Sequence, residues 1–368
     1  MPNFSLDDWD TSGEIPEVAV RLTSNNHTEV PLFDNEGNQS VIPSGLIPGF
    51  PVLVVKQNER IVVDSASSLK TRSTSSGNSF NFKFIDDAFD GTKIKTRATR
   101  RESTVPGNTD PVNIEAYNAG VEWHRDYIYY GLTPTNTEGK FRNNYSEFLN
   151  SFTLLDDWYN VISDQSGDPV ITANNIWTEG SFEFEITLLI NSTNGIGSTI
   201  EKRFTARGED VMMISYWRNR KAFYSISDIK SRPFNPDLEL LPWDLQDYGA
   251  TWKMTITEVD DPEEYSHTEE TTVEYATNFE ISGDVIKKIG LKFGGKESVT
   301  KKSSFSVKTT KSSDVLGSTI LSFKDPVVVG TEEVIGNRRE GSKTTTIYNR
   351  KEITTGMVRL RIEPEKMY

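Results

Sequence analysis

The sequence predicts an all-β protein, elongated and mainly antiparallel, with a long β-hairpin near its C-terminal end and an N-terminal β-rich recognition region. Two observations lead to this prediction. From Thr272 to Gly294 the side chains alternate almost without a break between apolar and polar. Elsewhere, short β-branched or aromatic runs are bounded by Gly, Pro, Asn or Ser, which is typical of strands joined by turns.

The alternation near the C-terminal end has the period of two that indicates a half-buried strand. Eight of its eleven odd positions are large and apolar, whereas Ile286 is the one such residue among its twelve even positions. Ordinary strands run about 3–10 residues, and this one is expected to reach roughly twenty. A ribbon of this length suits a rod-shaped protein or one that refolds into a membrane barrel.

Shorter elements are expected along the rest of the chain. Residues 181–191 and 358–363 alternate between apolar and polar side chains, as half-buried strands do. A helix is expected from about Asn144 to Ile162, where aromatic and leucine side chains recur at helical spacing. The other runs expected to form strands are 18–20, 51–55, 61–63 and 80–84.

Two turn-rich stretches, 103–111 and 232–237, indicate domain boundaries. No internal repeat or low-complexity tract interrupts the pattern. The expected division is 1–105 as an N-terminal β domain, 106–245 as a middle β-rich recognition domain and 246–368 as a C-terminal β module that carries the hairpin.

Composition narrows the classes of function. The 368 residues carry a net charge of −14, which argues against general nucleic-acid binding because that requires a basic surface. The absence of cysteine excludes disulfides, thiolate metal sites and cysteine nucleophiles. Met1-Pro2-Asn3-Phe4 does not open a signal peptide. We expect a secreted protein whose leader is absent from this chain or whose export uses none.

A search for catalytic motifs finds none that is recognisable. The three histidines, His27, His124 and His267, do not stand at metal-ligand spacing. No Gly-rich phosphate loop, nucleophile elbow or metalloprotease motif occurs. We therefore expect no enzymatic activity, no cofactor and no metal. The carboxylates are nevertheless numerous enough to supply a glycosidase pair, which leaves a carbohydrate-active enzyme as an alternative.

The densest aromatic region runs from Trp123 to Tyr130. One interpretation is a receptor-binding surface formed by Trp123, Tyr127 and Tyr129, because aromatic rings with polar tips stack on sugars and on partner side chains. The other is a strand whose rings fill a core, with Arg125 and Asp126 outside. The sequence is compatible with both interpretations.

The return strand of the expected hairpin defines its register. A three-residue turn at Gly294, Gly295 and Lys296 pairs Leu291 with Val299 and Val285 with Phe305. Both apolar stripes then share one face, and glycine suits the left-handed position that such turns require. Charge is uneven along the ribbon. Residues 258–284 contain ten carboxylates, whereas residues 285–311 contain eight lysines and one carboxylate.

With this hairpin, the chain from about Trp252 to Val329 resembles the aerolysin-like β-pore-forming proteins, in which an amphipathic hairpin lies within a C-terminal β module. The resemblance implies a water-soluble secreted toxin that binds a surface receptor, with a glycan as one candidate, and assembles into a membrane-associated homo-oligomer. Each subunit contributes one hairpin to a barrel whose strands need about 9–11 residues to cross. The residues expected to enter the membrane are Phe279, Ile281, Val285, Ile289, Leu291, Phe293, Val299, Phe305 and Val307.

Lysines occupy both faces of the expected ribbon. Lys287 and Lys301 depart from the otherwise apolar face, where a lipid-facing lysine costs about 2–4 kcal/mol at the midplane and about 0–1 kcal/mol near the interface. On the polar face, lysines would line the lumen of a barrel and favour anions. These lumen-facing residues are Lys288, Lys292, Lys302 and Lys308.

Other structures and functions fit the same pattern. A long hairpin packed by one face against a β-sandwich needs no membrane, and residues 284–292 are also compatible with a short helix. The main alternative function is a non-lytic surface adhesin or glycan-binding β-sandwich protein. Such a protein would be a stable monomer that uses the aromatic region for binding.

Overall fold

The computed structural model is mainly β, with 56% strand and 13% helix in several mostly antiparallel sheets. The coarse fold class predicted from the sequence is therefore confirmed. Within the described part, no helix is both long and apolar enough to cross a membrane. The structure describes residues 9–10, 12–21, 29–43, 46–56, 60–64, 81–89, 109–136, 139–156, 162, 176–178, 180–190, 198–218, 222–259, 264–276, 298–310, 314–338 and 341–367.

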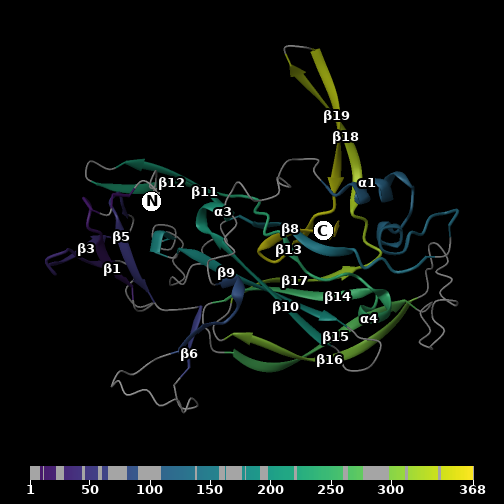
Figure 1. Ribbon diagram of the computed structural model, residues 1–368, viewed down its shortest axis with the longest axis horizontal. Coiled ribbons are helices and arrows are strands. Elements are labelled where there is room, and N and C mark those ends of the chain that lie inside the picture. Colours follow the sequence, from purple (N-terminus) through teal and green to yellow (C-terminus); the bar gives the residue numbers. More distant parts are fainter. Residues whose placement is uncertain are drawn as a thin grey trace.

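Two antiparallel sheets form the body of the protein (Figure 1). Their facing sides share one core, in which the ring of Phe152 lies 4.8 Å from the ring of Phe184 in the other sheet. The first sheet consists, in order, of β10 (Ser198–Arg207), β9 (Ser181–Ile190), β14 (Thr251–Glu258) and β17 (Asp314–Ser322). The second consists of β13 (Leu238–Glu239), β8 (Tyr145–Leu154), β21 (Val358–Lys366) and β20 (Ile353–Thr355).

The helix expected at residues 144–162 is wrong, because residues 145–154 form the strand β8. This strand lies inside its sheet, between β13 and β21. Phe152 points into the core, whereas Glu147 and Asn150 are also buried and have polar partners. The pairing with β21 shifts register between Leu149 and Ser151, so the core side chains change from an odd position, Leu149, to the even positions Phe152 and Leu154. This change breaks the period of two, and the resulting spacing resembles that of a helix.

The core of the body crosses the boundary expected near residue 245. β9 pairs with β14, and β8 pairs with β21, so each sheet takes strands from both sides of that boundary. One continuous hydrophobic cluster contains residues from Val112 to Ile362. The middle and C-terminal parts of the chain are therefore packed together in the described structure.

The N-terminal part forms a smaller sheet beside the body (Figure 1). Its own core consists of Ala19, Val30, Leu32 and Ile42. In order, the strands are β3 (Gln39–Pro43), β2 (Glu29–Phe33), β1 (Glu17–Arg21) and β5 (Val52–Lys56), with β1 and β5 parallel. A hairpin of β6 (Ile61–Asp64) and β7 (Asn81–Phe84) follows.

A third sheet connects the N-terminal part to the body. Its middle strand is β12 (Phe223–Ser231), which pairs with β11 (Met212–Arg218) on one side and with β4 (Ile47–Pro48) on the other. Because β4 comes from the N-terminal part, this pairing ties the two regions together.

The aromatic region between residues 123 and 130 is helical, so the strand considered for it is wrong. It follows α1 (Pro111–Asn118), which begins after Asp110, whose side chain accepts a hydrogen bond from the Val112 N–H. Residues Asp126–Tyr130 then form one wide helical turn, η3, closed by Gly131 at a φ of 70°. The other short helices in the part of the chain that the structure describes are η2 (Asp87–Phe89), η5 (Ile176–Thr178), α3 (Gly208–Val211) and α4 (Leu245–Tyr248).

Two long strands, β18 (Val328–Arg338) and β19 (Gly341–Arg350), form a hairpin that projects from the body (Figure 1). We call this hairpin the arm. The five consecutive residues 331–335 are all exposed. Because successive side chains of a strand point to opposite faces, both faces of the arm meet solvent there.

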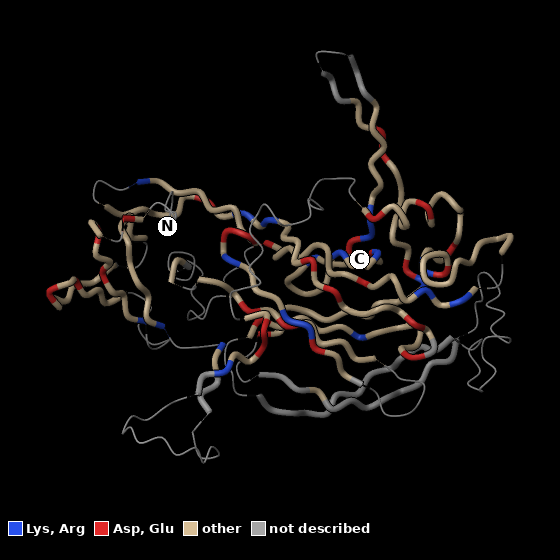
Figure 2. Tube along the Cα trace, viewed as in Figure 1, with Lys and Arg blue, Asp and Glu red and all other residues tan. Residues whose placement is uncertain are grey.

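Charged residues of both signs are interspersed along the body (Figure 2). Some form close pairs, as Arg203 does with Glu185 at 2.6 Å and Lys351 with Asp325 at 2.6 Å. The first pair is almost fully buried, whereas about a third of each side chain in the second is exposed. We therefore expect the first pair to be less sensitive to salt.

Replacing Phe152 with Ala should destabilise the joint between the two sheets. Its side chain is fully buried, and its ring centroid lies 4.8 Å from that of Phe184 and 5.5 Å from that of Phe204. Truncating a buried Phe costs about 3–5 kcal/mol, and we expect the free energy of unfolding in urea to fall by that amount. Ile335→Ala on the exposed arm is the control, and an equal loss in both variants would contradict this role of Phe152.

Candidate membrane-inserting hairpin

A long antiparallel hairpin is present near the C-terminal end, but its outgoing strand begins earlier than expected, and the structure describes only residues 272–276 of the alternating stretch that predicted it. β15 (Glu264–Ala276) and β16 (Ser298–Thr310) pair in antiparallel fashion over their whole length. The ladder runs without a bulge from Glu264 opposite Thr310 to Ala276 opposite Ser298. Each strand has 13 residues, which is more than the 9–11 or so that a barrel strand needs to cross a bilayer.

The register predicted for this hairpin is wrong. Val299 pairs with Tyr275 rather than Leu291, and Phe305 pairs with Glu269 rather than Val285. Both registers join odd positions to odd positions, so both keep the apolar stripes on one face. Alternation alone cannot distinguish registers that differ by an even number of residues, and this explains the error.

The paired strands are amphipathic by position. Half of the twelve odd positions in the ladder are apolar or aromatic, whereas Ala276 is the one apolar residue among the fourteen even positions. The odd positions also include charged residues, Glu269 opposite Phe305 and Lys301 opposite Val273. The apolar odd positions are Tyr265, Val273, Tyr275, Val299, Phe305 and Val307.

Much of the predicted membrane-entering segment lies outside the described residues. Of the predicted lumen-facing lysines, Lys302 and Lys308 lie at even positions of β16, opposite Thr272 and Ser266. Of the predicted lipid-facing residues, Val299, Phe305 and Val307 lie at odd positions of β16. The predicted hairpin residues that lie outside the described part of the chain are Phe279, Ile281, Val285, Lys288, Ile289, Leu291, Lys292, Phe293, Gly294, Gly295 and Lys296.

The hairpin lies against the outer face of a sheet. β15 and β16 form a third layer alongside the sheet that contains β9 and β14, on the side away from the core (Figure 1). Val307 is 5% exposed and packs on Leu189 of β9, which is fully buried. At this point, an odd-numbered side chain of the hairpin is held out of water by the sheet beneath it.

The sheet surface that carries Leu189 is otherwise polar. Along β9, the even positions enter the core, whereas Glu183, Glu185 and Thr187 share the outer face with Leu189. Both carboxylates are buried and paired, Glu185 with Arg203 and Glu183 with Arg60. Val307 is the one hairpin side chain whose surroundings the structure describes, and it forms an apolar cluster with Leu189.

Both ends of the hairpin are attached to neighbouring strands of that sheet. β15 follows β14 after residues 259–263, and β16 leads to β17 after residues 311–313. β14 and β17 pair with each other, and Glu258 stands opposite Asp314 at their ends. The two attachment points therefore stay side by side whether or not the hairpin lies on the sheet.

The residues predicted to bind a receptor do not form one surface. Tyr129 is fully buried, and its hydroxyl donates a hydrogen bond to Glu147. Trp123 is 9% exposed and is part of the main core. Tyr127 is half-buried, and its hydroxyl bonds Glu115. Trp123 and Tyr129 therefore fill the core, as the alternative interpretation had it, and cannot contact a receptor in this structure.

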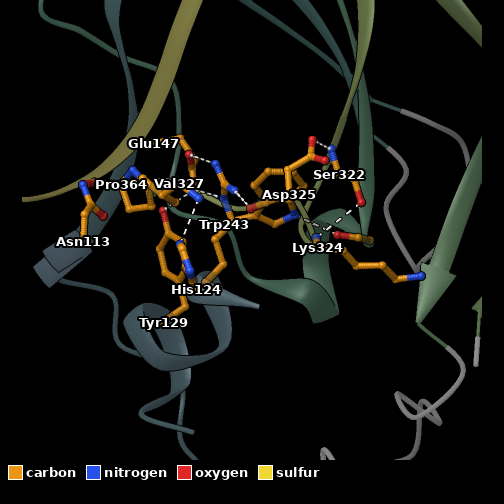
Figure 3. A network of polar contacts seen from close by, with 12 residues as sticks. Asn113, His124, Tyr129, Glu147, Trp243, Ser322, Lys324, Asp325, Val327 and Pro364 are labelled. Atoms are coloured by element: carbon orange, nitrogen blue, oxygen red, sulfur yellow. Dashed lines mark hydrogen bonds and ion pairs between the residues drawn. The ribbon is translucent and has the colours of Figure 1, made fainter. Parts of the chain in front are cut away.

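A buried polar network crosses the middle of the body (Figure 3). The guanidinium of Arg125 donates two hydrogen bonds to the Glu147 carboxylate, at 2.7 and 2.8 Å, and a third to the backbone carbonyl of Asp325. The same guanidinium lies 5.2 Å from the ring centroid of Trp243. Burial raises the pKa of Tyr129 well above its usual value, with the adjacent Glu147 charge acting in the same direction.

His124 fixes the base of the arm (Figure 3). Its Nδ1 accepts hydrogen bonds from the backbone N–H groups of Val327 and Val328, at 3.0 and 3.3 Å. The ring is 5% exposed, and its burial, with the nearby Arg125 charge, lowers its pKa to about 4. His124 is therefore neutral at pH 7, as its role as an acceptor requires.

The members of this network were not found from the sequence, where Arg125 and Asp126 were expected on the outside. Arg125 and Glu147 are 22 positions apart, and Arg125 and Asp325 are 200 apart. No local spacing connects residues at such separations. Among the residues that the structure describes, no group of three or more His, Asp or Glu is arranged to hold a metal ion.

Comparisons with family models, with curated proteins and with solved structures found no match for this chain.

Lowering the pH should weaken the base of the arm through His124. Because the folded-state pKa of His124 is about 4 and the unfolded value is about 6.5, its contribution to stability is complete above pH 6.5 and is lost as the pH falls toward 4. In His124→Asn, an amide oxygen can replace Nδ1 as acceptor but does not titrate. We expect the free energy of unfolding of the wild type to fall relative to that of this variant over this range.

Urea titrations of both proteins at several pH values measure this difference. Asp126 titrates in the opposite sense, because burial raises its pKa from 3.8 to about 7. Its contribution is present in both proteins and cancels in the comparison. A difference between the two proteins that stays constant from pH 7 to pH 4 would contradict the role given to His124.

Proposed function

We propose that this protein is a secreted β-pore-forming protein that binds a cell surface, assembles with copies of itself and inserts a hairpin containing β15 and β16 into the membrane. The observation that supports this most directly is the antiparallel pairing of β15 with β16. Two strands of sufficient length are paired in advance, and the more apolar face of the ladder includes Val307, which is buried on the sheet. The pattern also agrees with the resemblance to aerolysin-like proteins.

The attachment of the hairpin suits a swinging movement. Its two connections leave adjacent, paired strands, so the hairpin can leave the sheet as a unit while β14 and β17 stay paired. Among the described side chains, the apolar contact to be broken is that of Val307 with Leu189. Separating two buried aliphatic side chains costs a few kcal/mol, about 1.5–3 each, which burial of the same face in lipid offsets.

Closure into a barrel supplies the reason for assembly. A free two-stranded ribbon in lipid has two unpaired edges, and each unsatisfied backbone group there costs several kcal/mol. Hairpins from neighbouring copies satisfy those groups when they close a ring. Charged residues at odd positions, such as Lys301 and Glu269, are best accommodated near the headgroups, where their cost is lowest.

A disulfide between Leu189→Cys and Val307→Cys tests the proposal by fixing the hairpin to the sheet. The two side chains are in contact, and the chain has no other cysteine, so the cross-link is unambiguous. We expect the oxidised double variant to bind cells but to cause no leakage of dye from them or from liposomes. Reduction should restore leakage and the ring-shaped oligomers seen by electron microscopy.

Each single-cysteine variant is the matched control and should leak dye under both conditions. If the cross-linked protein leaks dye as fast as the reduced protein, this hairpin does not insert. If the wild type binds cells but remains a monomer and never causes leakage, the protein is instead a non-lytic adhesin.

A further inference from the structure

An exposed tryptophan stands on the sheet that connects the N-terminal part to the body. Trp217, on the edge strand β11, is 56% exposed, and Met213 on the same face is 52% exposed. Tryptophan is highly buried on average, and exposed aromatic residues are enriched where proteins bind partners. An exposed indole is therefore a stronger indication of a binding site than a single exposed aliphatic side chain.

Polar side chains follow this indole along the pairing of β11 with β12. Ser225 stands directly opposite Trp217, and Asp228 stands opposite Ser215. Asp228 and Lys230 form an ion pair at 3.0 Å, with their side chains 50% and 67% exposed. The hydroxyl stands directly opposite Trp217, the carboxylate stands opposite the residue two positions along β11, and the ammonium group stands opposite Met213, four positions along. We call this set, Ser215, Trp217, Ser225, Asp228 and Lys230, the Trp217 platform.

The backbone under the platform is firmly held. A β-bulge lies between Ser215 and Tyr216, next to Trp217, and bulges commonly redirect a side chain near a functional site. On the other side of β12, the Phe223 ring meets that of Phe50 edge-on at 5.7 Å. A Cβ on Gly49 would lie 2.7 Å from the Tyr224 ring, so glycine allows the close approach of that loop.

We propose that the Trp217 platform binds a neutral saccharide. The flat indole can cover the apolar C–H face of a sugar ring, while Asp228 accepts hydrogen bonds from hydroxyl groups and Lys230 donates them. The carboxylate and the ammonium group of the platform cancel, and the net charge of the chain is −14, so an anionic sugar or an anionic bilayer gains no net attraction. The inference deepens only the surface-binding step of the proposed function and does not depend on membrane insertion.

Binding to an array of immobilised neutral oligosaccharides, ending in mannose, galactose or N-acetylglucosamine, tests this assignment. We expect wild-type binding, a loss of about tenfold or more in affinity for Trp217→Ala, and partial retention for Trp217→Phe. Asp228→Asn should also weaken binding. Ile335→Ala, which truncates an equally exposed apolar side chain on the arm, is the matched control and should bind as the wild type does.

A second measurement locates the sugar. Binding should protect the wild-type tryptophan fluorescence from iodide quenching, and Trp217→Ala should lose this protection while unfolding at the wild-type temperature. Unchanged sugar binding by Trp217→Ala, or no wild-type binding to any of these neutral sugars, would overturn the assignment. So would binding of phosphatidylcholine vesicles that depends on Trp217 without sugar binding, because the platform would then be a membrane anchor. Sugar binding without dye leakage would support the platform while refuting insertion.

Discussion

The buried ion pair between Arg125 and Glu147 is the interaction on which the body depends most. Removing two charges from water is costly, and the structure offsets that cost with two short hydrogen bonds, a third to the Asp325 carbonyl and the face of Trp243. Arg125 lies just before η3, and its partners come from β8 and from the segments before α4 and β18. A single guanidinium thus links β8 of one sheet to the segment that follows β17 of the other.

The two faces of the sheet that contains β9 differ in what they bury. The even positions of β9 enter the main core, whereas its odd positions carry buried ion pairs and the small apolar seat for Val307. The first face belongs to the large hydrophobic cluster, and the second carries buried ion pairs and the described contact of Val307 with Leu189.

The sequence was sufficient where apolar and polar side chains alternate without interruption along a strand. β9 and β21 are strands as expected, and the predicted pairing of odd with odd positions is present between β15 and β16. The sequence was insufficient at β8, where a register shift in the pairing with β21 breaks the period of two, and at the aromatic region, which forms a wide helical turn. The register of β15 and β16 and the partners of Arg125 depend on long-range contacts, which no local pattern encodes.

The arm has a consequence for crowding between molecules. Its strands of 11 and 10 residues extend on the order of 30 Å at the usual rise of a strand. A second molecule that approaches this side must either pack beside the arm or stay at least the length of the arm away from the body. The arm therefore acts as a spacer that sets the minimum distance between two copies facing each other there, and shortening it would let them come closer.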